Sequence, residues 1–127
     1  MKWVVDTHSL VWYFTKDKRL SKRVKEIIQK GERGQEEVIL PSIVLLETIA
    51  ISEKKKIKFD IKKLFEFLES LPNLIVADLD LELIKEVTKT PKILDLHDRI
   101  IVAVSQIYEA VILTRDSQIK LFAKTLW

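Results

Sequence analysis

The sequence predicts an α/β fold in which helices cover both faces of a mostly parallel sheet, and three observations support this prediction. Short apolar segments alternate with longer segments of helical hydrophobic spacing along all 127 residues. The first apolar segment, Trp3 to Val5, is hydrophobic on both faces, as strands of parallel sheets are. The chain holds only 2 glycines and 3 prolines, which leaves little room for long loops. Such alternation favours parallel strands joined by helical crossovers.

Local signals set the bounds of each expected element. We expect strands at residues 2–6, 38–40, 74–77 and 110–113, with Pro41 stopping the second and Pro72-Asn73 turning the chain into the third. The sequence predicts helices at residues 10–14, 22–30, 43–55, 61–68, 81–89 and 95–108, with a last helix after Asp116. Gly31 and Gly34 should end the second of these helices. The side chains expected to cap helices are those of Ser21, Ser42, Asp60, Asp80 and Asp95.

Composition narrows the class of protein. A length of 127 residues and a mass of 14.9 kDa predict one domain, residues 1–127. The absence of cysteine excludes a disulfide scaffold and cysteine metal sites, and it fits a reducing compartment. No apolar run is long enough to span a bilayer, and the N-terminus lacks a signal-peptide pattern, so we expect a cytoplasmic protein. The formal net charge of +3 is mildly favourable for nucleic acid.

Two carboxylates fall at the carboxyl ends of predicted strands, where ligands bind in sheets of this class. Asp6 closes the first strand, and Asp116 follows Leu113 by three residues. When either residue is taken alone, a turn or a helix N-cap is the favoured explanation. Further along, Asp95 fits an N-cap, and Asp98 lies in the first turn, where it favours the helix dipole and can still face a cleft.

Glu47 is the most informative acid, because its helix neighbours at three and four residues are apolar. They are Ile43, Val44, Ala50 and Ile51. Glu47 should therefore project from a stripe that faces the core. A buried carboxylate without a partner costs several kcal/mol, so Glu47 either pairs with a base or binds a cation.

Asp6, Glu47, Asp98 and Asp116 can all reach one edge of the predicted sheet. Four converging carboxylates repel one another unless some are protonated or a cation neutralises them. An all-oxygen cluster without cysteine suits Mg²⁺ or Mn²⁺ rather than zinc. Such sites usually serve phosphoryl or phosphodiester transfer. The chain holds no glycine-rich phosphate loop, and its two histidines, His8 and His97, do not form a metal-spaced pair.

Three blocks of the sequence resemble PIN-domain toxins of the VapC type. VVDTHSLVWYFTKDKRLSKRVKEII is similar to the opening of that family, and ILPSIVLLETIAISEKKKIK to its second block, which carries an acid in mid-helix. HDRIIVAVSQIYEAVILTRDSQI resembles the third block, and the terminal TLW is similar to the end of the family. The blocks span nearly all 127 residues, and their order and spacing carry the resemblance.

The resemblance implies a metal-dependent ribonuclease with a three-layer α/β/α sandwich around a sheet of four or five strands. It places the acidic quartet of the family on Asp6, Glu47, Asp98 and Asp116, and a further acid on Asp95. It also implies a homodimer and inhibition by a small antitoxin. The step before the third acid departs from many relatives, with Leu96-His97 in place of a small or Pro-Phe step. Candidate RNA contacts are the two arginines that adjoin the matched acids, Arg99 and Arg115.

Two other functions stay open at this point. A receiver-type phosphoacceptor domain has the same length and βα alternation, with Asp6 near the metal and Asp78 as the acceptor. Against it, the first strand ends in a single acid, no lysine ends the fourth strand, and Glu47 is left unexplained. A catalytically inactive binding protein of the same fold is the third candidate, and the presence of all four acids argues against it.

Overall fold

A parallel sheet forms the middle layer of the protein. The computed structural model describes residues 1–54 and 59–127. Its five strands lie in the order β3-β2-β1-β4-β5, and every neighbouring pair is parallel. The strands are β1 (Lys2–Val5), β2 (Glu37–Pro41), β3 (Leu74–Ala77), β4 (Val111–Leu113) and β5 (Thr125–Leu126). The four predicted strands are therefore confirmed, and β5 adds a short edge strand that had no clear sequence signal.

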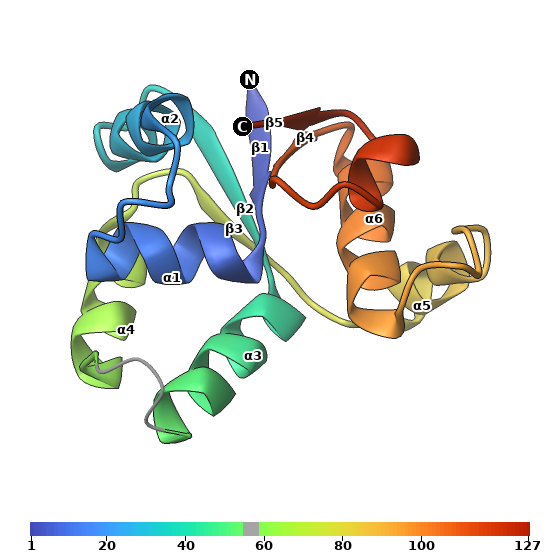
Figure 1. The fold of residues 1–127 in the computed structure, drawn as a ribbon, viewed down its shortest axis with the longest axis horizontal. Helices are drawn as coiled ribbons and strands as arrows, with labels where there is room; N and C mark the ends of the chain where they lie inside the picture. The colour runs from blue at the N-terminus through green and yellow to red at the C-terminus, as the bar shows by residue number, and fades with distance from the viewer. Residues whose placement is uncertain (55–58) are drawn as a thin grey trace.

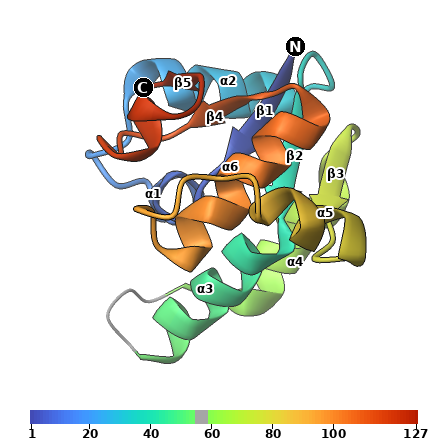
Figure 2. The ribbon, with the colours of Figure 1, turned by 90° about the vertical axis from the view of Figure 1, so that its right-hand side faces the viewer.

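Helices cover both faces of this sheet. They are α1 (Thr7–Thr15), α2 (Lys22–Glu32), α3 (Ser42–Glu53), α4 (Ile61–Ser70), α5 (Leu81–Val87) and α6 (Leu96–Tyr108). Figure 1 shows α1, α2 and α4 on one side of the sheet and α5 and α6 on the other. Figure 2 shows α6 crossing in front of the strands. The predicted three-layer α/β/α sandwich is confirmed, and none of the described helices has the length and apolar character needed to cross a bilayer.

Four of the five predicted helix caps are present. The side chains of Ser21, Asp60, Asp80 and Asp95 each accept a backbone N–H in the first turn of the following helix. The prediction for Ser42 is wrong. Pro41 occupies the N-cap position of α3 without a side-chain hydrogen bond, because the last residue of β2 is extended and leads directly into the helix.

Several predicted boundaries also differ from the structure. The helix α1 begins at Thr7, directly after β1, and not at Leu10. In place of the last helix there is a single 3₁₀ turn, η1 (Ile119–Leu121), followed by β5. The helix α3 ends at Glu53 in the described residues, and its predicted end at Lys55 lies outside them.

The topology creates one switch point, between β1 and β4. The chain runs outward from β1 through β2 to β3 and then returns to place β4 on the other side of β1. Val5 pairs with Leu113, so the residues after these two strands leave the same edge of the sheet. Because helices depart in opposite directions from a switch point, a crevice opens at the carboxyl ends of its two strands.

Gly31 lies inside α2, one residue before its last residue, so the predicted stop is wrong at this position. A Cβ atom at Gly31 would lie 2.6 Å from Cγ2 of Val38, which is buried in β2. The glycine therefore permits close packing of α2 on the sheet. Gly34, with φ of +73°, follows the helix and adopts the left-handed conformation that glycine favours.

We expect Gly31→Ala to lower the free energy of unfolding by about 1 kcal/mol. The helix gains up to about 1 kcal/mol of propensity, but the clash with a β-branched core residue costs about 1–3 kcal/mol. Urea denaturation measures the difference, with Lys25→Ala on the exposed face of α2 as the control. In a Val38→Ala background the same glycine substitution should cost less, because the clashing methyl is absent. An equal cost in both backgrounds would contradict this explanation.

Candidate active site

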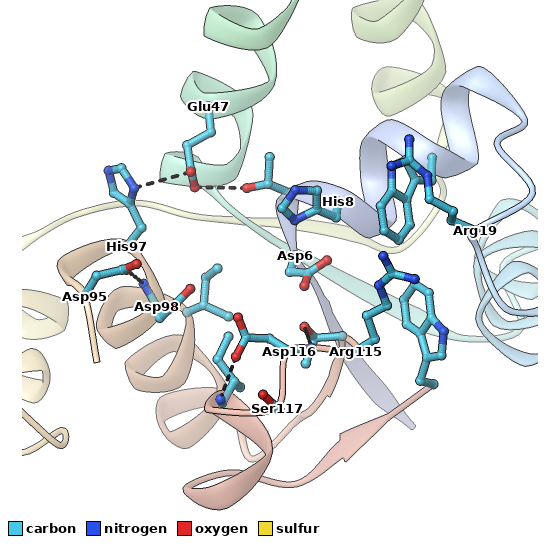
Figure 3. Close-up of a pocket in the computed structure, with 16 residues that line it drawn as sticks. Asp6, His8, Arg19, Glu47, Asp95, His97, Asp98, Arg115, Asp116 and Ser117 are labelled. Carbon is cyan, nitrogen blue, oxygen red and sulfur yellow. Dashed lines mark hydrogen bonds and ion pairs between the residues drawn. The ribbon is translucent and has the colours of Figure 1, made fainter. Parts of the chain in front are cut away.

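A cleft of about 580 Å³ opens at the carboxyl edge of β1 and β4, at the switch point. Asp6 follows β1, Glu47 comes from α3, and Asp98 from the first turn of α6. Asp116 comes from the segment after β4. All four predicted acids line this one cleft together with Asp95 (Figure 3). The structure thus brings together side chains from four segments that are far apart in the sequence.

Asp6 is both a helix cap and a wall of the cleft. Its Oδ1 accepts a hydrogen bond of 2.8 Å from the backbone N–H of Ser9, which makes Asp6 the N-cap of α1. The hydroxyl of Ser9 donates at 2.7 Å to the carbonyl of Leu113, so the start of α1 is tied to the end of β4. Asp6 is only 7% exposed. These contacts fix the orientation of its carboxylate.

Asp116 is held in a similar way. Its Oδ1 accepts backbone N–H groups of Gln118 at 2.8 Å and Ile119 at 3.0 Å, at the entry to the 3₁₀ turn. Its own backbone N–H donates to Oγ1 of Thr114 at 3.1 Å. In both Asp6 and Asp116 one carboxylate oxygen thus accepts backbone N–H groups, and the side chain still lines the cleft (Figure 3).

Asp98 lies among the other acids. The side chain of Asp95 accepts its backbone N–H at 2.9 Å as the N-cap of α6, while among the described residues no hydrogen bond reaches the Asp98 carboxylate. Partial burial, followed by the negative charges of Asp95, Asp116, Glu47 and Asp6, raises the pKa of Asp98 to about 6. The carboxyl groups are therefore close enough for their negative charges to oppose the ionisation of Asp98, whose carboxylate accepts no hydrogen bond from the described residues.

Glu47 is not turned into the core, contrary to the prediction from its apolar neighbours. Its side chain is 27% exposed and faces the cleft. Oε1 accepts the hydroxyl of Thr7 at 2.9 Å, and Oε2 lies 3.3 Å from Nδ1 of His97. Apolar residues occur all around α3, with Leu46 62% exposed, so they do not mark one buried face. Of the two predicted alternatives, a partner base is present in the structure, and it is His97 from α6.

The two candidate RNA contacts lie in different places. Arg115 lines the cleft. Arg99 instead donates from Nε to Oγ1 of Thr90 and from Nη2 to the carbonyl of Val87, both at 3.0 Å. These contacts tie α6 to the end of α5, so the geometry gives Arg99 a structural role. The structure offers no support for Arg99 as a contact to RNA.

A comparison with protein families matches residues 3–125 to the PIN domain. The chain belongs to the PIN-domain family. The resemblance carried by the three sequence blocks is thereby confirmed. No curated protein shows significant sequence similarity to the chain. PIN domains are typically nucleases and generally depend on a metal ion.

The fold also matches a chain in the crystal structure of VapBC2 from Rickettsia felis bound to a DNA fragment from their promoter. The TM-score is 0.75 at 17% sequence identity, and the match covers 100% of this chain and 99% of that chain. At this identity the likeness concerns the fold. The shared fold extends over nearly the whole length of both chains.

The chemistry of the donor set fits a hard divalent cation in this PIN domain. Within residues 1–54 and 59–127, no three histidine or acidic side chains stand close enough to enclose an ion as they are. Mutual repulsion of the uncompensated carboxylates is a sufficient reason for that spacing. The Asp98 carboxyl, without a hydrogen-bond partner in the described structure and with a raised pKa, would gain most from a neighbouring cation. Oxygen donors of this type are those that Mg²⁺ and Mn²⁺ prefer.

Proposed function

We propose that this PIN-domain protein is a metal-dependent endoribonuclease and the toxin of a VapBC-type toxin–antitoxin module. The observation that carries the proposal is the convergence of Asp6, Glu47, Asp98 and Asp116 on one cleft at the switch point of the sheet. Family membership supports nuclease activity, and the likeness to a chain of a VapBC2 complex supports the toxin role. RNA as substrate follows from the resemblance to VapC-type toxins.

In this proposal Asp6, Asp98 and Asp116 hold Mg²⁺ or Mn²⁺. The bound cation would polarise the scissile phosphate, lower the pKa of a water and neutralise charge on the leaving oxygen. The chain itself supplies orientation, because hydrogen bonds from backbone N–H groups fix the carboxylates of Asp6 and Asp116 before any ligand arrives. Groups fixed in advance need no reorganisation as charge develops in the transition state.

Glu47 either takes part in holding the cation or orients the attacking water. Two contacts keep its carboxylate in place, the hydroxyl of Thr7 and the imidazole of His97. The water attacks phosphorus in line with the leaving oxygen and passes its proton to a neighbouring base or to solvent. Thr7 and His97 act on the reaction through Glu47 and are positioning residues in this proposal.

The receiver-type alternative has less support. It requires Asp6 and Asp78 in one site, because the acceptor must lie beside the bound metal. Asp78 follows β3, which β2 separates from β1, and it lines a different cavity beside α5. The family assignment also favours the nuclease.

Incubation of the purified protein with unpaired and structured RNA, in Mg²⁺, in Mn²⁺ and in EDTA, tests the proposed activity. We expect endonucleolytic products in either metal and none in EDTA. Products that form equally in EDTA, from protein shown to be free of contaminating ribonuclease, would exclude the metal-dependent mechanism. Transfer of phosphate from an acyl-phosphate donor to the protein would instead favour the receiver-type function.

The toxin role predicts a small antitoxin, encoded next to this protein, and action on RNA in the cytoplasm. Expression of the protein alone in a bacterial host should arrest growth, and expression together with the neighbouring reading frame should restore it. Growth arrest that the neighbouring product does not relieve would count against the module while leaving the nuclease activity intact.

We further propose a homodimer. The aromatic residues of α1 do not form a free surface, since Trp12 is 4% exposed and Tyr13 and Phe14 pack against the core. Exposed apolar side chains occur instead on α5 and the segments beside it, with exposures from 46% to 75%. They are Leu79, Leu81, Ile84, Ile93 and Leu96. An obligate interface of a homodimer is typically rich in such residues.

The double variant Leu81→Glu/Ile84→Glu should shift the protein from dimer to monomer in sedimentation-velocity experiments, because buried charges oppose association. Leu121→Glu, at an equally exposed apolar residue of η1, serves as the control and should leave the dimer unchanged. A wild-type protein that sediments as a monomer at micromolar concentrations would refute the dimer itself.

A further inference from the structure

The side chain of Arg115, at the end of the acidic cleft, is a cation held in position by an aromatic ring and, among the described residues, not by an ion pair. The guanidinium carbon of Arg115 lies 4.5 Å from the ring centroid of Trp12. Trp12 is almost completely buried and meets Trp127 edge to face, with centroids 5.9 Å apart. Among the described residues, no hydrogen bond or ion pair engages the Arg115 guanidinium. A flat cation on a rigid aromatic platform keeps its N–H donors free for a ligand.

Arg19 provides an internal comparison. Its guanidinium carbon lies 4.6 Å from the same Trp12 ring, but Asp17 holds it with two hydrogen bonds, of 3.1 and 2.8 Å. Those bonds, with a smaller contribution from the charge of Arg115, lower the pKa of Asp17 to about 2. Arg19 is therefore hydrogen-bonded to an acid, whereas among the described residues no acid hydrogen-bonds the Arg115 guanidinium. Figure 3 places both arginines at the end of the cleft opposite Asp95 and His97.

A second cavity, of about 440 Å³, begins where Arg115 stands. It shares Arg115, Thr114 and Trp127 with the acidic cleft, so the two cavities adjoin. Arg23 from α2 and Lys120 from η1 also line it, and among the described residues no acidic side chain does. A cavity with three cations thus lies directly beside one with five carboxylates.

The basic cavity beside the acidic cleft can offset the repulsion that an RNA phosphate meets in the cleft. An RNA phosphate that enters the acidic cleft is repelled by its carboxylates before any cation compensates them. A neighbouring phosphate in the basic cavity would be attracted at the same time, because the two phosphates belong to one strand. Binding energy at the unreactive phosphate can in this way hold the reactive one in place.

We propose that Arg115, Arg23 and Lys120 form a subsite for the backbone phosphate that flanks the scissile bond in an unpaired stretch of RNA. The proposal rests on the ribonuclease function and deepens it. An unpaired strand can follow two adjoining cavities around Arg115, whereas a stiff duplex presents its phosphates on a fixed outer surface. Trp12 acts as a positioning residue, because it contacts Arg115 and not the phosphate.

Equilibrium binding without catalysis tests this subsite. A short fluorescein-labelled unpaired RNA is titrated with protein in EDTA, and fluorescence anisotropy gives Kd at several salt concentrations. Arg115→Ala should raise Kd about tenfold, the effect of one lost charge-assisted contact, and reduce the slope of log Kd against log salt by about 0.7. Arg33→Ala, an equal loss of charge at the end of α2, should change neither quantity.

Two further variants separate the subsite from a general charge effect. Arg115→Lys should restore the salt slope and recover only part of the affinity, because lysine lacks the planar fork that stacks on Trp12. Lys120→Ala should act in the same direction as Arg115→Ala. Thermal melting of each variant identifies any loss of folded protein, and the exposed positions of these side chains make such a loss small.

The outcomes distinguish the subsite from the function on which it rests. If Arg115→Ala and Lys120→Ala bind RNA with the affinity and salt slope of the wild type, the subsite is wrong, even when metal-dependent cleavage is normal. If the wild type binds RNA with the expected dependence on Arg115 but cleaves nothing in Mg²⁺ or Mn²⁺, the subsite stands and the nuclease function fails. A wild type that does not bind RNA in EDTA overturns the subsite, and the cleavage assay in Mg²⁺ or Mn²⁺ then decides the nuclease function by itself.

Discussion

Replacing Asp6 by Asn should reduce metal-dependent RNA cleavage about a hundredfold or more and leave the fold intact. The substitution removes one negative charge from the cleft but keeps the Oδ1 acceptor that receives the N–H of Ser9. Asparagine caps helices about as well as aspartate, so α1 should start as before. Without a cation the variant should be as stable as the wild type or slightly more stable, because repulsion among the acids falls.

A matched control separates the two roles of Asp6. Asp80 caps α5 with the same geometry, accepting the N–H of Leu83 at 2.9 Å, but it lies outside the acidic cleft. Initial rates of RNA cleavage in saturating Mn²⁺ measure both variants. Asp80→Asn should leave the rate unchanged, and Asp6→Asn should lower it. Equal activity of the two variants would mean that Asp6 serves only as a cap.

The sequence predicted the layers of the fold well because each depends on local signals. Apolar runs mark β1 to β4, and the cap side chains that start α2, α4, α5 and α6 act on their own first turn. The predictions that failed concern features that depend on contacts between segments distant in the sequence. The sequence predicts a helix end at Gly31, but the glycine is needed because Val38, in a strand that packs against the helix, leaves no room for a Cβ atom. The strand β5 has two residues, and its pairing with β4 defines it.

For the candidate site, the acids were predictable and their contacts were not. Asp6 and Asp116 follow strands, and the carboxyl edge of a parallel sheet gathers such residues wherever the strands adjoin. The pairing of Glu47 with His97 joins positions on α3 and α6, and no periodicity relates them. Thr7 follows Asp6 directly, and this position next to a strand-end acid is the sequence signal that could have indicated a place for Thr7 in the site. The basic cavity likewise combines Arg23 with Lys120, which only the folded chain brings together.

Asp98→Asn should abolish most of the cleavage activity and yet stabilise the metal-free protein at neutral pH. The pKa of Asp98 is raised to about 6 from an ordinary value of 3.8, by burial and by four neighbouring acids. A raised pKa means that the folded state binds the proton more tightly than the unfolded state does. The contribution of protonated Asp98 to stability is complete below about pH 3.8 and is lost as the pH rises through about 6.

Above that range the ionised carboxylate lowers the stability of the folded state, and asparagine avoids this cost. Because the group is only partly buried, solvent screening reduces the effect, and we expect a gain of about 1 kcal/mol for Asp98→Asn at pH 7.5 in EDTA. Near pH 4 the gain should be much smaller. Urea denaturation at both values measures it, with Glu66→Gln on α4 as a control that removes one exposed negative charge.

A cation should reverse the order of stability, because it stabilises the ionised form of Asp98. Wild type should then gain more from Mn²⁺ than Asp98→Asn does, since a ligand that binds only the folded state stabilises it in proportion to its affinity. The same variant should cleave RNA about a hundredfold more slowly than wild type. A gain in stability that is equal at pH 4 and pH 7.5 would show that Asp98 does not titrate in this range. An Mn²⁺ effect that is equal in both proteins would show that Asp98 does not contact the cation.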